Sequence, residues 1–260
     1  GHGTRCAGTV LGRNTGVGRF GIPPGSKKAL IAKVISQNGG ASSATVIKAM
    51  EWAAENGANV ISMSLGINFP DVVQKTIAEG VPTVLAASRA LEAYVATIRL
   101  FEKTTSLIKE KGNWTSNPIV FVAAAGNDSD RKVNLEYELA VTPPANSEGF
   151  ISVGALGIVD GAGGLDVANF SNTGPNISAP GVDVISAEPG GGLSTRSGTS
   201  MATPHVAGVA ALWVEKMKTE GLLNSNLLTA RILGSASTTG LLDGYDRYDV
   251  GAGLARAPQQ

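Results

Sequence analysis

The sequence predicts a single α/β domain in which helices flank a mainly parallel central sheet. Short apolar runs occupy Ala29–Ile35, Val60–Leu65 and Ile119–Ala125, and they lack the alternation of half-exposed strands, which is typical of strands covered on both faces. Helical patterns separate these runs, as in β-α-β units. The chain has 260 residues, of which 43% are hydrophobic and 34 are glycine, so one domain can bury a sizeable core.

The first predicted helix follows the first apolar run. Ser42 or Ser43 can cap its N-terminus, and Asn56-Gly57 ends it. Its apolar positions share one face and should pack on the sheet: Val46, Ile47, Met50 and Ala53.

The later elements follow from the same kinds of signal. A long amphipathic helix is predicted over about Ser88–Lys111, with Gly112 ending it and one apolar stripe of Leu91, Tyr94, Val95, Ile98, Phe101 and Ile108. Short strands are predicted at Phe150–Ala155 and Val182–Ala187. A buried helix is predicted over Ser200–Lys218, with Val206, Val209, Ala210, Trp213 and Met217 facing inward.

Composition excludes several classes of partner. Lysine plus arginine and aspartate plus glutamate number 21 each, and no basic run interleaved with aromatic residues occurs, so neither nucleic acid nor anionic lipid is favoured. The single cysteine, Cys6, excludes an intrachain disulfide and a cysteine-rich zinc site. No run approaches the roughly 20 apolar residues that cross a bilayer, so we expect no membrane span.

Ser200 lies where a loop meets a predicted helix. The segment Gly198–His205 reads GTSMATPH, and free backbone N–H groups and the positive end of the helix dipole meet at such a junction. A serine nucleophile benefits there, because its own N–H can donate to the oxyanion that forms when the hydroxyl attacks a carbonyl. Taken alone, the segment fits an ordinary N-cap serine better.

Four segments together resemble one protein family. Gly198–Gly208, GTSMATPHVAG, resembles the nucleophile signature of the subtilisin-like serine peptidases, or subtilases, and Gly1–Gly8, GHGTRCAG, resembles their histidine signature. Ala123–Asn127 resembles the segment that carries the oxyanion asparagine, and Asn59–Gly66 resembles the substrate-binding strand. The resemblance implies a subtilisin-like three-layer fold and a serine endopeptidase that works through an acyl-enzyme intermediate.

The resemblance assigns three catalytic residues. His2 is the general base, whose ordinary pKa near 6.5 lets it take the Ser200 proton and return it to the leaving amine. Asn127 donates a side-chain N–H to the oxyanion, although a turn residue after a strand would look the same without the family context. We expect His205 to be structural, because it follows Ser200 by five residues in the same helix and cannot easily turn its ring back onto the hydroxyl.

Two further positions leave alternatives open. Cys6 lies one helical turn from His2 if the segment is helical, and it is either a small buried hydrophobic residue, which we favour, or a thiol whose modification would perturb His2. Pro143–Pro144 corresponds to a position where many relatives have a cis proline, and a cis bond or an ordinary trans turn fits the sequence about equally.

Substrate binding is expected to use backbone groups. Gly39-Gly40-Ala41 and Ser64-Leu65-Gly66 each follow a predicted strand and carry small side chains, so an extended polypeptide could pair with both edges. Ala124, Ala125 and Gly126 would form the other wall of the pocket before the scissile bond.

The aspartate of the family's triad has no counterpart in this sequence. The resemblance places it on a strand upstream of the histidine, inside the sheet, and the chain opens at Gly1-His2. We therefore expect residues 1–260 to be a partial peptidase domain with a helical insertion at about Phe69–Asn117 and its natural start upstream. This fragment by itself should be poorly active, and the neighbours of the absent strand should lack hydrogen-bond partners.

The competing readings are a catalytically silent module that binds peptides and an esterase or lipase. The first has no need for His2, Asn127 and Ser200 together. The second would want a Gly-x-Ser-x-Gly elbow with the histidine last in the chain. No cofactor is expected. The Arg13–Arg19 loop resembles a calcium-binding region of some members, but its arginines disfavour a cation, so no metal ligand is assigned. We expect a monomer, and the resemblance implies secretion.

Overall fold

The computed structural model describes residues 1–14, 16, 18, 20–26, 28–36, 40–159, 161 and 163–259. A five-stranded sheet organises it, with the path β1-β2-β3-β4 and with β5 also pairing with β3. These strands are β1 (Val60–Met63), β2 (Val120–Ala124), β3 (Phe150–Val159), β4 (Gly164–Val167) and β5 (Ile177–Pro180). The pairs β1–β2, β2–β3 and β3–β5 are parallel and β3–β4 is antiparallel, which confirms the mainly parallel sheet.

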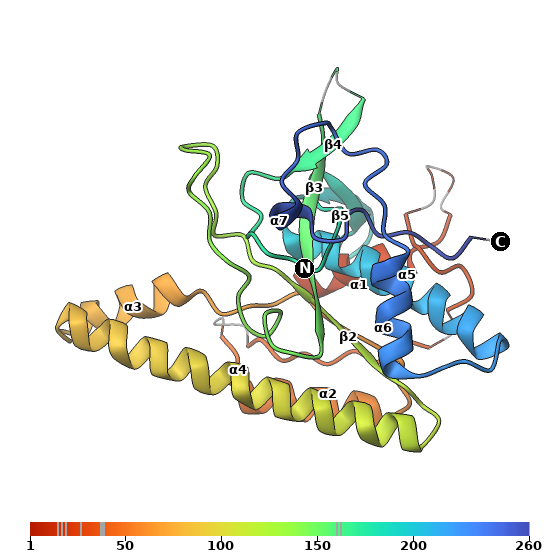
Figure 1. Cartoon of the computed structure of the whole chain (residues 1–260), viewed down its shortest axis with the longest axis horizontal. Helices are drawn as coiled ribbons and strands as arrows, with labels where there is room; N and C mark the ends of the chain where they lie inside the picture. The colour runs from red at the N-terminus through yellow and green to blue at the C-terminus, as the bar shows by residue number, and fades with distance from the viewer. Residues whose placement is uncertain are drawn as a thin grey trace.

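Both faces of the sheet are covered, because successive side chains of a strand point to opposite faces. All five residues of β2 are buried. Val120 and Val122 join a core with α5 (Thr199–Thr219) and α6 (Ser225–Gly234), whereas Phe121 and Ala123 join a second core with α2 (Ser43–Glu55) and α4 (Thr83–Trp114). Figure 1 shows the resulting three layers, which are those expected of a subtilisin-like α/β fold.

The predicted helices form with bounds close to those expected. Ser42 caps α2 by accepting a hydrogen bond from the Thr45 backbone N–H at 3.1 Å, and Asn56 ends the helix. In α5 the five side chains predicted to face inward are all buried: Val206, Val209, Ala210, Trp213 and Met217. The remaining helices are α1 (His2–Leu11), α3 (Phe69–Ala78) and α7 (Arg247–Val250).

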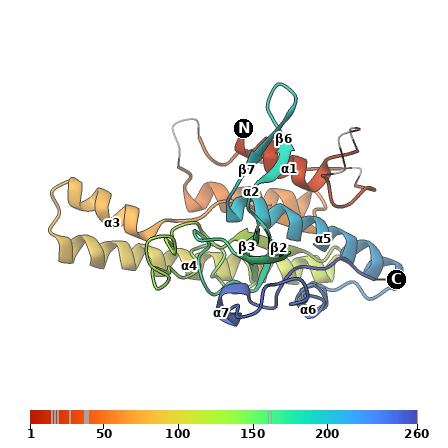
Figure 2. The same ribbon diagram turned by 90° about the horizontal axis from the view of Figure 1, so that it is seen from above.

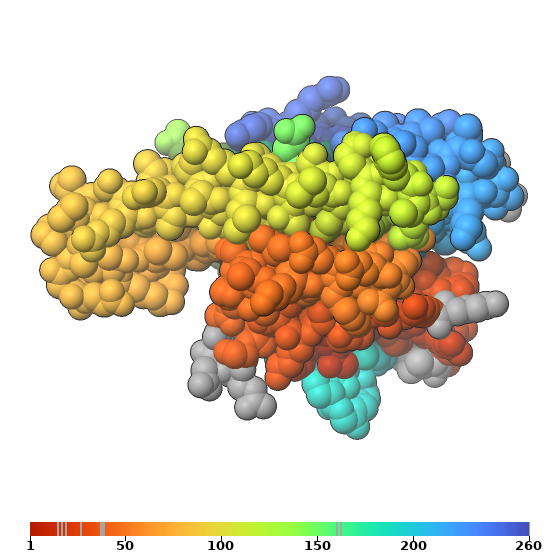
Figure 3. Space-filling model, turned by 90° about the horizontal axis from the view of Figure 1, so that it is seen from below, coloured from red at the N-terminus to blue at the C-terminus, as the bar shows by residue number. Residues whose placement is uncertain are grey.

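The long helix α4 differs from its prediction. It has 32 residues, and only its second half covers the sheet, through the buried Phe101 and Ile108. Its first half packs against α3 and extends past the body of the molecule (Figures 1 and 3). Leu91 was therefore wrongly predicted to be covered and is 56% exposed. The segment predicted as an insertion thus contributes to the core in its second half.

The first predicted strand, Ala29–Ile35, was wrong. Within the described part of the chain it forms no ladder, and Ile31 is 70% exposed. The reason is backbone pairing, because an apolar run becomes a strand only beside another strand. Among the described residues β1 is an edge strand that pairs with β2 alone.

The remaining chain completes the region around the N-terminus. The predicted strand at Val182–Ala187 forms β6 (Val184–Ala187), which pairs antiparallel with β7 (Leu193–Arg196). This hairpin lies beside α1 (Figure 2), where the Ser186 hydroxyl donates to the Arg5 carbonyl at 2.7 Å. The Pro143–Pro144 bond is cis, the alternative proposed from the resemblance. None of the described helices combines the length and apolar character that a membrane crossing needs.

Candidate active site

Ser200 lies in the first turn of α5, next to two other elements. Gly198 precedes the helix with φ 151°, a backbone conformation that favours glycine. The Ser200 carbonyl accepts hydrogen bonds from the Ser64 hydroxyl at 2.9 Å and from the Cys6 thiol at 3.6 Å. The first turn of α5 is thereby joined to the segment after β1 and to α1.

One cavity brings the three predicted catalytic residues together. It has a volume of about 380 Å³, and its lining comes from α1, the segment after β2, and the junction of β7 with α5: Gly1, His2, Arg5, Asn127, Arg196, Ser197, Gly198, Ser200 and Met201. Asn127 and Ser200, which follow His2 by 125 and 198 positions in the sequence, therefore line the same cavity as His2.

The side-chain amide of Asn127 is held in one orientation. Its Oδ1 accepts from the Thr199 backbone N–H at 2.7 Å and from the Thr199 hydroxyl at 3.0 Å. The Thr199 hydroxyl in turn accepts from the Gly126 N–H at 3.2 Å. Since Oδ1 is engaged and Asn127 is exposed, its Nδ2 hydrogens are available to an acceptor in the cavity.

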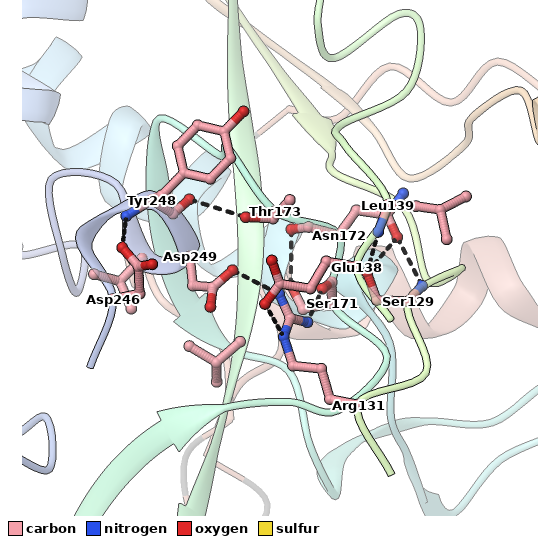
Figure 4. A network of polar contacts seen from close by, with 12 residues as sticks. Ser129, Arg131, Glu138, Leu139, Ser171, Asn172, Thr173, Asp246, Tyr248 and Asp249 are labelled. Carbon is pink, nitrogen blue, oxygen red and sulfur yellow. Dashed lines mark hydrogen bonds and ion pairs between the residues drawn. The ribbon is translucent and has the colours of Figure 1, made fainter. Parts of the chain in front are cut away.

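Asn172, which the sequence interpretation missed, holds the loop that carries Asn127. Its Oδ1 accepts from the backbone N–H groups of Asp128 at 2.8 Å and Ser129 at 3.1 Å. Its own N–H donates to the Gly126 carbonyl at 3.2 Å, and Asn172 is fully buried. Figure 4 shows Asn172 between Thr173 and Ser129. The sequence signal that could have identified Asn172 is a polar residue inside a Phe-Ser-Asn-Thr-Gly turn. The neighbouring residues do not indicate that it binds the loop after Asn127.

Beside this loop, Arg131 joins the turn to α7 (Figure 4). Its guanidinium pairs with Glu138 at 3.0 Å and Asp249 at 2.5 Å, and it donates to the Ser171 carbonyl at 2.5 Å. The Arg131 side chain is only 7% exposed, so its charge is compensated inside the protein.

His2 is the first residue of α1 and lines the cavity. Partial burial lowers the pKa of its imidazole, and nearby positive charge, including that of Arg5, acts in the same direction. Its Nδ1 lies 3.8 Å from the Cys6 sulfur. No carboxylate of the described residues forms a hydrogen bond or ion pair with His2.

His205 and Cys6 both contact backbone carbonyls in the first turn of α5. His205 does not line the cavity, and its Nδ1 lies 2.9 Å from the Met201 carbonyl, which makes Nδ1–H the donor. Burial lowers the pKa of His205. For Cys6, burial raises the pKa of the thiol, which disfavours the reactive thiolate.

The predicted substrate-binding segments lie at the carboxyl ends of β1 and β2. Because Met63 pairs with Ala123, the segments Ser64–Gly66 and Ala124–Gly126 lie at the same edge of the sheet, and Ala124 is the last residue of β2. They do not line the cavity that holds Ser200, and Ala125 is fully buried, with its N–H and carbonyl bonded to Val153 and Thr142.

The remaining predicted substrate-binding and metal-binding positions are exposed or lie outside the described residues. Gly40 and Ala41 are exposed before α2, and Gly39 lies outside the described residues. Part of the Arg13–Arg19 loop also lies outside them. In the part of the chain that the structure describes, no three histidine, cysteine, aspartate or glutamate side chains converge as metal ligands.

Comparison with known proteins decides the family. The family model described as "Subtilase family" matches residues 1–253. The chain belongs to the subtilase family. As a subtilase it is 36% identical over 248 residues to the thermostable alkaline protease of Halalkalibacterium halodurans, covering 92% of this chain and 55% of that protein. It is 31% identical to subtilisin DY of Bacillus licheniformis, covering 98% of this chain and 75% of that one.

Solved structures agree with the subtilase assignment. Sphericase superimposes with a TM-score of 0.70 at 28% identity, covering 99% of this chain and 78% of that one. The prenylagaramide maturation protease PagA superimposes with a TM-score of 0.66 at 26% identity, covering 98% and 79%. The subtilase chain therefore spans about half the length of the alkaline protease and over three quarters of these two structures.

Proposed function

We propose that this subtilase chain carries the catalytic centre of a serine endopeptidase that cleaves extended polypeptides through an acyl-enzyme intermediate. The observation that supports it is the single cavity lined by His2, Asn127 and Ser200, which come from three segments far apart in the sequence. These are a base, an oxyanion donor and a nucleophile, the three functions that acyl transfer requires.

In the proposed mechanism, the Ser200 oxygen attacks the scissile carbonyl carbon while His2 takes the hydroxyl proton. The C=O electron pair moves onto oxygen, and the negative charge is stabilised by Asn127 Nδ2 and by the Ser200 backbone N–H at the start of α5. When the C–N bond breaks, His2 gives the proton to the leaving amine and an ester on Ser200 remains. Water then attacks the ester with His2 again as base, which releases the acid and restores Ser200.

The orientation of Asn127 supports its role. Thr199 occupies the amide oxygen with two hydrogen bonds, so the Nδ2 side is the one presented to the cavity. The loop cannot easily shift, because Asn172 accepts from two of its backbone N–H groups. A donor held in place before the reaction stabilises the transition state without reorganisation.

We further propose that the carboxylate that orients His2 comes from a segment outside these residues. In support, the described part of the chain offers His2 no carboxylate partner. Without one, the imidazolium that forms during the reaction is not stabilised, and loss of this group costs about 3 × 10⁴ in kcat in subtilisin. The chain alone should therefore be a poor catalyst. An extracytoplasmic location and a monomeric state remain part of this proposal and rest on family resemblance.

The test is labelling by a fluorophosphonate probe of this chain and of the full-length gene product. Labelling of the full-length protein that Ser200→Ala abolishes would support the peptidase. Ser106→Ala, an exposed serine of α4, is the matched control and should label like the parent. Absence of labelling in the full-length protein, together with saturable binding of peptides, would favour a silent peptide-binding module instead.

A further inference from the structure

The cavity at Ser200 has a cationic wall. Besides His2, its ionisable side chains are Arg5 and Arg196, and no aspartate or glutamate is among its lining residues. Arginines that line a reaction site can bind carboxylates, because a guanidinium group forms paired hydrogen bonds with a carboxylate.

We infer that the arginines face the leaving-group side of the scissile bond. His2, which lines the same cavity, must reach the nitrogen of the leaving amine in order to protonate it. The segments expected to hold the acyl side, Ser64–Gly66 and Ala124–Gly126, are absent from the lining. The cavity therefore receives the residues that follow the cleaved bond.

The two arginines differ in how their charge is compensated. Arg5 is buried in α1 and pairs with Glu188, and its Nε has no hydrogen-bond partner among the described residues. This pair fixes the position of Arg5 and offsets much of its charge. Arg196 is exposed at the end of β7 and forms no ion pair within the described part of the chain.

The nearby carboxylates of Asp183 and Glu188 contact the Ser197 hydroxyl and Arg5, respectively. The carboxylate of Asp183 lies 3.3 Å from the Ser197 hydroxyl, and neither Asp183 nor Glu188 lines the cavity. The β6–β7 hairpin holds Arg196 in place through the pairing of Val184 with Arg196. Arg196 is thus an available cation on a fixed strand beside the nucleophile.

We propose that Arg196 makes the leaving-group side of the site selective for a carboxylate, either an acidic side chain in the first two residues after the scissile bond or a free chain-terminal carboxylate. This rests on the proposed peptidase function and names its substrate class. Because Arg196 is solvent-exposed, the preference should be about two- to fivefold in kcat/KM and should decrease with salt.

The experiment uses the full-length enzyme and internally quenched peptides that share one sequence on the acyl side. One arm places Glu, Gln or Lys at each of the two positions after the cleaved bond, in peptides with amidated ends. A second arm keeps Gln there and compares a free carboxylate with an amide at the chain end two residues after the bond. The arms distinguish a side-chain carboxylate from a terminal one.

In the parent enzyme, Glu or the free carboxylate should be favoured over Gln, and Lys should be the poorest. Arg196→Gln should remove the preference, and Arg196→Glu should reverse it. Arg99→Gln, an exposed arginine of α4, is the control and should leave the ratios unchanged. Fluorophosphonate labelling of Ser200 shows that each variant is folded and has a working nucleophile.

The two levels of the hypothesis fail in different ways. Equal kcat/KM for Glu, Gln and Lys peptides in the parent enzyme, or a Glu preference that survives Arg196→Glu, would overturn the carboxylate proposal while leaving the peptidase intact. Failure to cleave every peptide, together with no labelling of Ser200, would overturn the peptidase function itself.

Discussion

Replacing Asp249 by asparagine tests the buried charge cluster that joins α7 to the turn beside the loop that carries Asn127. Asp249→Asn keeps the shape of the side chain and removes its charge. The Asp249 side chain is 12% exposed and that of Arg131 is 7% exposed, so the charge left on Arg131 stays inside the protein (Figure 4).

The expected loss of stability follows from these contacts. Removing one partner of a buried ion pair costs about 3–5 kcal/mol, because the other charge is left uncompensated. Glu138, whose side chain is 33% exposed, still neutralises part of the Arg131 charge, so we expect the lower end, about 3 kcal/mol. The double variant Arg131→Met, Asp249→Leu removes both charges of the pair. Its loss of stability should be much smaller than the sum of the losses of the single variants Arg131→Met and Asp249→Leu.

The assay is urea unfolding at low salt, followed by tryptophan fluorescence. Glu55→Gln is the matched control, because it breaks the exposed pair with Lys111, whose side chains are 62% and 69% exposed, and should cost less than about 1 kcal/mol. The reasoning would be refuted if Asp249→Asn cost no more than the control, or if the double variant lost the full sum of the singles.

Three other predictions concern residues around the site. Asn172→Ala leaves the buried Ser129 N–H and the half-buried Asp128 N–H without acceptors, so urea unfolding should show a loss of about 1–3 kcal/mol for the first and less for the second, and labelling of the full-length protein should slow; unchanged stability would contradict the role of Asn172. Gly208→Ala places a Cβ 2.5 Å from the Ile22 Cβ, which should cost about 1–3 kcal/mol, and the double variant with Ile22→Gly, which removes that atom, should cost less than the sum of the two single variants; an additive double variant would argue against this contact. Burial lowers the pKa of His205, so the unfolded chain binds a proton at this residue more readily than the folded chain does. The contribution of neutral His205 to the free energy of unfolding is therefore complete above about pH 6.5 and is lost as the pH falls below that value. His205→Gln should therefore lose less stability than the parent between pH 7.5 and pH 5, and equal losses would contradict this assignment.

Local patterns were sufficient for the elements that carry the fold. The apolar runs at Val60–Leu65 and Ile119–Ala125 became neighbouring parallel strands, because residues that suit a strand were placed where both faces could be covered. The helix start at Ser42 or Ser43 and the buried positions of α5 also followed from spacing alone, and the structure shows that Ser42 is the cap. The motifs around His2 and Ser200 indicated the family before any contact was known.

The pairing of strands and the length of α4 that covers the sheet could not be predicted from local sequence. Ala29–Ile35 has the composition of a strand, yet a strand also needs a neighbour with free hydrogen-bonding groups, and the sequence does not specify the neighbour. The stripe on α4 was read correctly at Phe101 and Ile108 but not at Leu91, because periodicity indicates a face and not how far the sheet beneath it extends.

The sequence by itself determined the fold class and the family and proposed a base, a nucleophile and an oxyanion donor, because those depend on local patterns and long motif matches. Only the tertiary structure decided that Thr199 orients Asn127, that Asn172 holds the loop and that Arg196 faces the nucleophile's cavity. These contacts join side chains dozens of residues apart along the chain. Their partners depend on how the layers pack, and packing distances are not contained in the spacing of residues.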